Sequence, residues 1–177
     1  MFSLSLSLAS LSHLSCFVSC FSIRFSFSFL LLADVPSCGA NAGFAEDYAY
    51  LIQGLLDLYE ASFDGRWLRW AVRLQATMDE RFADTVHGGY FNSAADAADI
   101  VVRLKEDYDG AEPAPSSVAA MNLLRLEALT GGEATGGYRA RAMGTLAALR
   151  MQWSRVPQGL PQLLCALELA FLPPRHV

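Results

Sequence analysis

A helical hairpin pattern that occurs twice constrains the fold of this chain more than any other feature. Leu55 begins the run L-L-D-L-Y-E-A, and after a short turn the run W-L-R-W-A follows from Trp67. The similar runs L-L-R-L-E-A and Y-R-A-R-A start at Leu123 and Tyr138, with a longer glycine-rich turn between them. Such a repeat is the signature of stacked helix pairs, each burying its apolar face against its neighbours. The sequence therefore predicts a mainly α fold of about two and a half αα-hairpins, stacked as a solenoid or a toroid.

Capping residues and apolar spacing predict where the helices begin and end. Between residues 45 and 60 the apolar side chains recur every three or four residues and extend beyond one stripe, which indicates a helix buried on most sides. The expected elements are this helix over 45–60, a second capped by Asp64 with a core stripe as far as Phe82, a third capped by Ser116 or Ser117 that stops at Gly131, a fourth over about 138–153, and a fifth opened by Pro161.

A small β-hairpin insertion is predicted between the second and third helices. Residues 87–91 and 100–103 have the composition of short strands, and the polar residues 92–99 connect them. The acidic stretch R-L-K-E-D-Y-D-G-A-E-P overlaps the second strand and runs on from Arg103. Four carboxylates crowd this stretch, which makes it the first place to look for a functional site.

Residues 1–42 differ in composition from the rest of the chain. From residue 1 to residue 33 the segment is built almost wholly of Ser, Leu and Phe, and Arg24 is its one charged side chain. Its apolar character is that of a targeting segment, although no positive region precedes the apolar run. Translation of a pyrimidine tract before a splice acceptor would give the same residues, so a gene-model artefact is the alternative. We divide the chain into a low-complexity leader at 1–42, expected to be disordered, and a helical domain at 43–177.

Charge and cysteine content exclude several classes of function. The net charge is −5, with basic and acidic residues interleaved, whereas nucleic-acid binding calls for a basic surface, so no nucleic-acid partner is expected. Cys165 is the one cysteine of the helical domain and is expected to be a small buried hydrophobe. No His, Cys and carboxylate set has ligand spacing, so neither a metal nor a cofactor is expected. A membrane span is not expected in the helical domain; a soluble intracellular location is favoured, or a secretory or organellar one if the leader is genuine.

Residues 43–177 resemble the C-terminal part of the spermatogenesis-associated protein 20 family, whose members are also described as thioredoxin-domain-containing proteins. The runs that carry the resemblance are E-D-Y-A-Y-L-I-Q-G-L-L-D-L-Y-E-A from Glu46, W-L-R-W-A-V-R-L-Q from Trp67, G-G-Y-F from Gly88, the acidic stretch from Arg103, N-L-L-R-L from Asn122, L-P-Q-L-L from Leu160 and the final H-V. The resemblance implies an N-terminal thioredoxin-like domain in full-length relatives, followed by an (α/α)6 toroid like that of N-acylglucosamine 2-epimerases and six-hairpin glycosidases.

On this resemblance the chain is expected to be a truncated member that carries part of the toroid and is inactive alone. The family pattern E-P-x-x-N-S has Asn where this chain has Ser116. Two functions are implied: a carbohydrate-active toroid of the epimerase or glycosidase type, with a carbohydrate or other small polar ligand, or a structural scaffold for the redox domain. Glycan binding by a full-length relative, lost on replacement of Asp107 or Asp109 by Asn, would favour the first function. Absence of glycan binding would favour the second.

The toroid resemblance also implies that the acidic stretch and the E-D-Y-A helix start face a ligand funnel. Sugar chemistry uses two carboxylates about 5 to 9.5 Å apart, and tyrosine rings can stack on a sugar. The structural alternative has Asp109 and Glu112 complementing the following helix while Lys105 and Arg103 pair with Glu106 and Asp107, and it leaves His87 as an exposed loop residue. The ligand-binding candidates are Asp47, Tyr48, Tyr90, Asp107, Asp109 and Glu112.

Overall fold

Helices joined by irregular segments make up the part of the chain that the computed structural model describes, which is residues 43–97, 100–131 and 137–172. The predicted leader at 1–42 lies outside these residues. None of the helices within the described ranges is long and apolar enough to cross a membrane. The helices are α2 (Ala45–Ser62), α3 (Gly65–Phe82), α4 (Pro115–Thr130), α5 (Tyr138–Ala148), α6 (Arg150–Arg155) and α7 (Pro161–Phe171), with a 3-10 turn, η1 (Pro157–Gly159), before α7.

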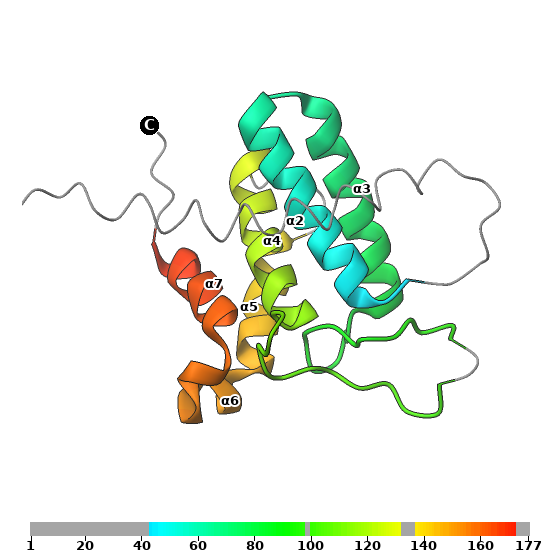
Figure 1. The fold of residues 1–177 in the computed structure, drawn as a ribbon, viewed down its shortest axis with the longest axis vertical. Helices are drawn as coiled ribbons and strands as arrows, with labels where there is room; N and C mark the ends of the chain where they lie inside the picture. The colour runs from blue at the N-terminus through cyan, green and yellow to red at the C-terminus, as the bar shows by residue number, and fades with distance from the viewer. Residues whose placement is uncertain (1–42, 98–99, 132–136, 173–177) are drawn as a thin grey trace, which may run out of the picture. The chain divides into compact units, whose positions relative to one another are not determined.

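The first predicted hairpin is formed by α2 and α3, which lie side by side and run in opposite directions (Figure 1). Phe63 ends α2 in a left-handed conformation with φ 54°, and the carboxylate of Asp64 accepts a hydrogen bond of 3.0 Å from the backbone N–H of Arg66. Asp64 therefore caps α3, as predicted. Both helices contribute to the core, with buried side chains that include Leu51, Ile52, Leu55, Leu56, Ala71, Met78 and Phe82.

The central helix of the described part is α4, which contacts α2, α5 and α7. Its amide at Asn122 donates a hydrogen bond of 2.8 Å to the carbonyl of Ala49, and Arg125 forms ion pairs with Asp57 and Glu60 at 2.7 and 2.8 Å. These polar contacts tie α4 to α2 across the two hairpins. The helix stops at Gly131, whose φ of 69° suits a residue without a Cβ, as predicted.

The N-terminus of α4 corrects the prediction that Ser116 or Ser117 caps it. The cap residue is Ala114, Pro115 opens the helix, and both serines lie buried within its first turn. Proline suits this position because its fixed φ is helical and its missing N–H has no partner there in any case. The hydroxyl of Ser116 instead accepts a hydrogen bond of 3.0 Å from the backbone N–H of Tyr90.

The helix predicted over about 138–153 is divided into α5 and α6. The division falls at Leu149, which is buried and whose ψ of 13° departs from helical geometry. The indole N–H of Trp153 then donates to the carbonyl of Leu146 at 3.0 Å, which ties α6 to the end of α5. The last helix, α7, starts at Pro161 as predicted.

The predicted strands 87–91 and 100–103 are not formed, and the described residues contain one isolated antiparallel bridge, between Ala83 and Tyr90. Gly88 and Gly89 have φ of 79° and 77°, which makes a turn where extended backbone was expected. Arg103 directs its guanidinium to backbone carbonyls, donating to those of Ser93 and Arg81 at 3.0 and 3.1 Å. Side-chain contacts, together with backbone bonds such as that from the N–H of Asn92 to the carbonyl of Leu104 at 2.8 Å, thus hold the loop in place of a strand ladder. Residues 98 and 99 of the predicted connection lie outside the described residues.

Candidate functional site

Asp109 lies at the centre of the acidic stretch and joins the starts of two helices. One carboxylate oxygen accepts a hydrogen bond of 2.8 Å from the N–H of Ala114, the cap residue of α4. The other accepts from the N–H groups of Gln162 and Leu163 in the first turn of α7, at 2.9 and 3.4 Å. Asp109 is 6% exposed, and its own N–H donates to the carbonyl of Gly159 at 2.7 Å. One buried carboxylate therefore satisfies N–H groups that have no partner within either helix.

The remaining acidic candidates lie at the surface. Asp47, in the first turn of α2, accepts a hydrogen bond of 2.8 Å from the N–H of Phe44 and so stabilises the start of its own helix. Asp107 is exposed, and the amide of Gln152 approaches its carboxylate at 3.4 Å. Glu112 is also exposed. Asp107 and Glu112 therefore keep carboxylate oxygens accessible to a ligand.

The two tyrosine candidates make contacts within the protein. Tyr90 is 2% exposed, and its hydroxyl donates to Asp79 at 2.5 Å and accepts from the amide of Gln75 at 3.3 Å. Burial raises the pKa of Tyr90 well above its ordinary value, with the Asp79 carboxylate adding to the effect. The hydroxyl of Tyr48 accepts from Arg81 at 3.2 Å, and its ring centroid lies 5.2 Å from that of Phe82. Tyr90 is thus a core residue, whereas Tyr48 is partly accessible.

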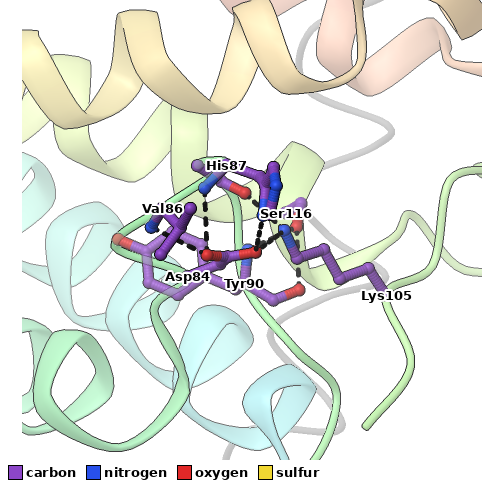
Figure 2. A network of polar contacts seen from close by, with 7 residues as sticks. Asp84, Val86, His87, Tyr90, Lys105 and Ser116 are labelled. Atoms are coloured by element: carbon purple, nitrogen blue, oxygen red, sulfur yellow. Dashed lines mark hydrogen bonds and ion pairs between the residues drawn. The ribbon is translucent and has the colours of Figure 1, made fainter.

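Asp84 organises the turn that precedes Tyr90 (Figure 2). Its carboxylate accepts from the backbone N–H groups of Val86 and His87 at 2.9 and 3.0 Å and pairs with the ammonium of Lys105 at 2.6 Å. Lys105 also donates to the carbonyl of Gly88 at 2.6 Å. The hydrogen bond from Lys105 and those from the turn hold the pKa of Asp84 well below its usual range. His87 is exposed as predicted, with its Nδ1 3.4 Å from Asp84.

The basic residues of the acidic stretch do not make the predicted pairs. Lys105 pairs with Asp84 in place of Glu106 or Asp107, and the guanidinium of Arg103 binds backbone carbonyls and lies 4.1 Å from the ring centroid of Phe91. Both cations thus contribute contacts that hold the loop. Asp84 was not among the candidates, although an aspartate shortly before a Gly-Gly pair is a turn signal in the sequence.

The start of α2 lies close to the acidic stretch. Burial raises the pKa of Glu46, and the nearby carboxylates of Asp47, Glu106 and Glu112 raise it further. Tyr50 lies between the two segments and donates a hydrogen bond of 2.9 Å to the carbonyl of Pro113. An acidic surface therefore forms where the E-D-Y-A helix start meets the loop. No group of three or more His, Cys, Asp or Glu side chains among the described residues is placed to hold a metal ion.

Cys165 corrects another prediction, because it is exposed and free. The face of α7 that packs against the core carries Leu163, Ala166 and Ala170. In a helix, residues three and four apart share a face, and Cys165 falls outside that set. Its spacing from Leu163 and Ala166 was therefore a signal of exposure.

Comparison with known proteins decides the family. The chain is 48% identical over 127 residues to spermatogenesis-associated protein 20 of Mus musculus and, with the same figures, to that of Homo sapiens. The chain belongs to the spermatogenesis-associated protein 20 family. An uncharacterized protein of Caenorhabditis elegans is 40% identical over 125 residues. Each of these matches covers 71% of this chain and 16% of the relative. No protein-family model matches the chain.

Membership in the spermatogenesis-associated protein 20 family confirms the resemblance carried by the helical runs and the acidic stretch. The chain spans 16% of the length of these relatives, so activities of the whole proteins do not follow from the match. A shared fold also does not establish a shared reaction. What the site does is therefore argued from its own contacts.

Proposed function

We propose that residues 43–172 act as a structural segment of a larger helical domain in the spermatogenesis-associated protein 20 family. The observation that supports this most is the use of Asp109, whose carboxylate accepts three backbone N–H bonds from two helix starts while 6% exposed. A carboxylate engaged in this way has little capacity left to transfer a proton or bind a sugar. Its position suits a structural role, in which it holds the N-terminal ends of α4 and α7 together.

The proposal extends to the architecture of the whole domain. Two helical hairpins with α4 in contact with α2, α5 and α7 support stacking of further hairpins on either side, as in an (α/α)6 toroid. In this proposal the toroid is a scaffold for the thioredoxin-like domain expected in full-length relatives. The chain alone would then have no catalytic activity.

A second candidate is binding of a carbohydrate or another small polar ligand at the acidic surface. The specific observation in its favour is the raised pKa of Glu46 among Asp47, Glu106 and Glu112. A carboxyl group whose pKa is raised is one feature of a general acid. The exposed ring of Tyr108 in the same stretch is available for stacking on a sugar.

Fragment complementation tests the structural proposal. Mouse spermatogenesis-associated protein 20 with the matched segment deleted would be co-purified with the full chain supplied separately. We expect the two to elute together and the deleted relative to gain thermal stability, because the added hairpins bury apolar faces left open by the deletion. Separate elution at equal and excess concentration of the chain would contradict the proposal.

A glycan screen tests the second candidate. Binding of mono- and oligosaccharides to the full chain would be measured by ligand-observed NMR, with Glu46→Gln and Glu112→Gln as variants. Saturable binding that both variants weaken at least about tenfold would support the acidic surface as a sugar site, a loss of about 1.4 kcal/mol. Absence of binding, or binding that both variants retain, would remove this candidate and leave the structural proposal.

A further inference from the structure

A shallow groove on α3 carries positive charge that is only partly compensated, since Arg66 alone among its arginines pairs with a carboxylate, that of Asp64, within the described residues. Its lining consists of Arg66, Leu68, Arg69, Val72 and Arg73 from α3, with Thr130 from the end of α4. The side chains of Arg69 and Arg73 are exposed and have no ion-pair partner within the described ranges. Leu68 and Val72 thus supply the apolar part of the lining, and the arginines supply its charge. Such a surface suits an occupant that is apolar and acidic in alternation.

A segment of the same chain has this composition. Val101 is 98% exposed, and Leu104 and Tyr108 are also exposed, so residues 100–108 present apolar side chains to solvent. Arg103 and Lys105 are held inward by their hydrogen bonds to the loop, which leaves the exposed Glu106 and Asp107 as the outward charges. We call residues 100–108 the acidic loop. Its outward face is apolar and negative, whereas the groove is apolar and positive.

The acidic loop cannot reach the groove of its own chain. The loop adjoins the C-terminal end of α3, where the guanidinium of Arg103 donates to the carbonyl of Arg81 at 3.1 Å, whereas the groove lies in the N-terminal half of that helix. Figure 1 shows this loop at one end of the helical hairpin and the α2–α3 connection at the other. From Arg69 to Phe82 a helix advances about 20 Å at about 1.5 Å per residue. The complementary surfaces therefore face different molecules.

From this complementarity we infer that the acidic loop of one copy of the chain docks in the α3 groove of a second copy. Glu106 and Asp107 then lie against Arg69 and Arg73, and the exposed valine and leucine side chains of the loop contact Leu68 and Val72. The contact is head-to-tail, so each added copy leaves one groove and one loop free and association continues beyond the dimer. Both surfaces are small, which makes the contact weak and sensitive to salt. This inference does not depend on the proposed function.

Sedimentation velocity of the full chain across a range of protein concentrations tests the inference. The weight-average mass of the wild type is expected to rise with concentration at low salt and to fall towards the monomer at about 1 M salt, where the Debye length is about 3 Å. The double variants Arg69→Glu/Arg73→Glu and Glu106→Arg/Asp107→Arg each lose one of the two surfaces and are expected to remain monomeric. Circular dichroism of each variant checks that the helices are intact.

Mixing the two variants gives the decisive result. The acidic loop of the first variant faces the wild-type groove of the second, and the Arg-bearing loop of the second faces the Glu-bearing groove of the first, so both junctions pair opposite charges in an equimolar mixture. We expect the mixture to regain the concentration-dependent association of the wild type, with growth beyond the dimer. A mixture that stays monomeric while the wild type associates would overturn the inference, as would a wild type that stays monomeric at every concentration.

Matched control variants separate this contact from general charge effects. Arg150→Glu/Arg155→Glu on α6 makes the same charge change as the groove variant, and Glu80→Arg/Glu168→Arg makes the same change as the loop variant. Both controls are expected to associate as the wild type does. Loss of association in either control to the extent seen in its test variant would also overturn the inference, because net charge would then explain the result.

Discussion

Replacing Asp109 by alanine removes one side chain that serves two helices. The substitution leaves the N–H groups of Ala114, Gln162 and Leu163 without their acceptor, and the two shorter bonds measure 2.8 and 2.9 Å. Loss of a cap costs about 0.5 to 2 kcal/mol, and a hydrogen bond to a charged group contributes about 1.5 to 3 kcal/mol. Water can replace the bond to Gln162, which is partly exposed, whereas Ala114 and Leu163 are fully buried. We expect the free energy of unfolding to fall by about 2 to 4 kcal/mol.

Urea unfolding of the full chain, followed by far-ultraviolet circular dichroism and by tryptophan fluorescence, measures this change. The denaturation midpoint is expected to fall with little change in the slope, and the melting temperature is expected to fall by about 10 °C. Asp107→Ala is the control, since that carboxylate is exposed and has a single contact of 3.4 Å; its effect should stay within about 0.5 kcal/mol. Equal effects of Asp109→Ala and Asp107→Ala would refute the structural role of Asp109.

Three further predictions concern the turn at residues 84–90, which follows α3. Gly88→Ala should destabilise the protein by about 3 kcal/mol in a melting experiment, because φ is 79° and the added Cβ would lie 2.6 Å from the carbonyl oxygen of Gly144. Gly131→Ala is the control, since nothing lies near its Cβ, and it should cost about 1 kcal/mol. Tyr90→Phe removes a buried hydroxyl with two partners and should cost about 1 to 2 kcal/mol in urea unfolding. The Asp84 carboxylate, its pKa lowered by Lys105, stabilises the fold above the ordinary carboxyl pKa of about 4, so the stability difference between wild type and Asp84→Asn should shrink as the pH falls from 7 to 3.

Each of these predictions has a result that would contradict it. Equal losses for Gly88→Ala and Gly131→Ala would mean that the close approach of the turn to α5 is absent. A Tyr90→Phe variant as stable as the wild type would show that the hydroxyl contacts contribute nothing net. A stability difference for Asp84→Asn that is constant from pH 7 to pH 3 would show that the pKa of Asp84 is not lowered in the folded protein.

Local chemistry explains what the sequence predicts well. Asp64, Gly131 and Pro161 mark helix ends through local effects. The side chain of Asp64 accepts from a free N–H, Gly131 has no Cβ to oppose a positive φ, and the ring of Pro161 fixes a helical φ. The same reasoning missed the division at Leu149, since no proline or glycine marks that position and the apolar spacing continues through it. The burial of Leu149 and the hydrogen bond of the Trp153 indole to the carbonyl of Leu146 accompany the change of geometry there.

Contacts between distant residues explain what the sequence does not predict. The bond between Asp109 and the start of α7 joins residues 53 positions apart, and the pair of Lys105 with Asp84 joins residues 21 apart. The residue types show that Asp109 and Lys105 each need a polar partner. They do not show which of the many polar groups in the chain that partner is. Tyr90 illustrates the same limit, because an aromatic residue beside glycines is equally suited to a ligand surface and to the core.

Amide hydrogen exchange of the wild-type chain, measured by NMR at neutral pH, tests most directly the claim that the acidic stretch is structural. In an isolated helix the first N–H groups have no partner and exchange fast. If the Asp109 carboxylate holds α4 and α7 together, the amides of Ala114 and Gln162 exchange as slowly as those in the middle of α4. Exchange of both amides at the rate of unstructured peptide would contradict that claim.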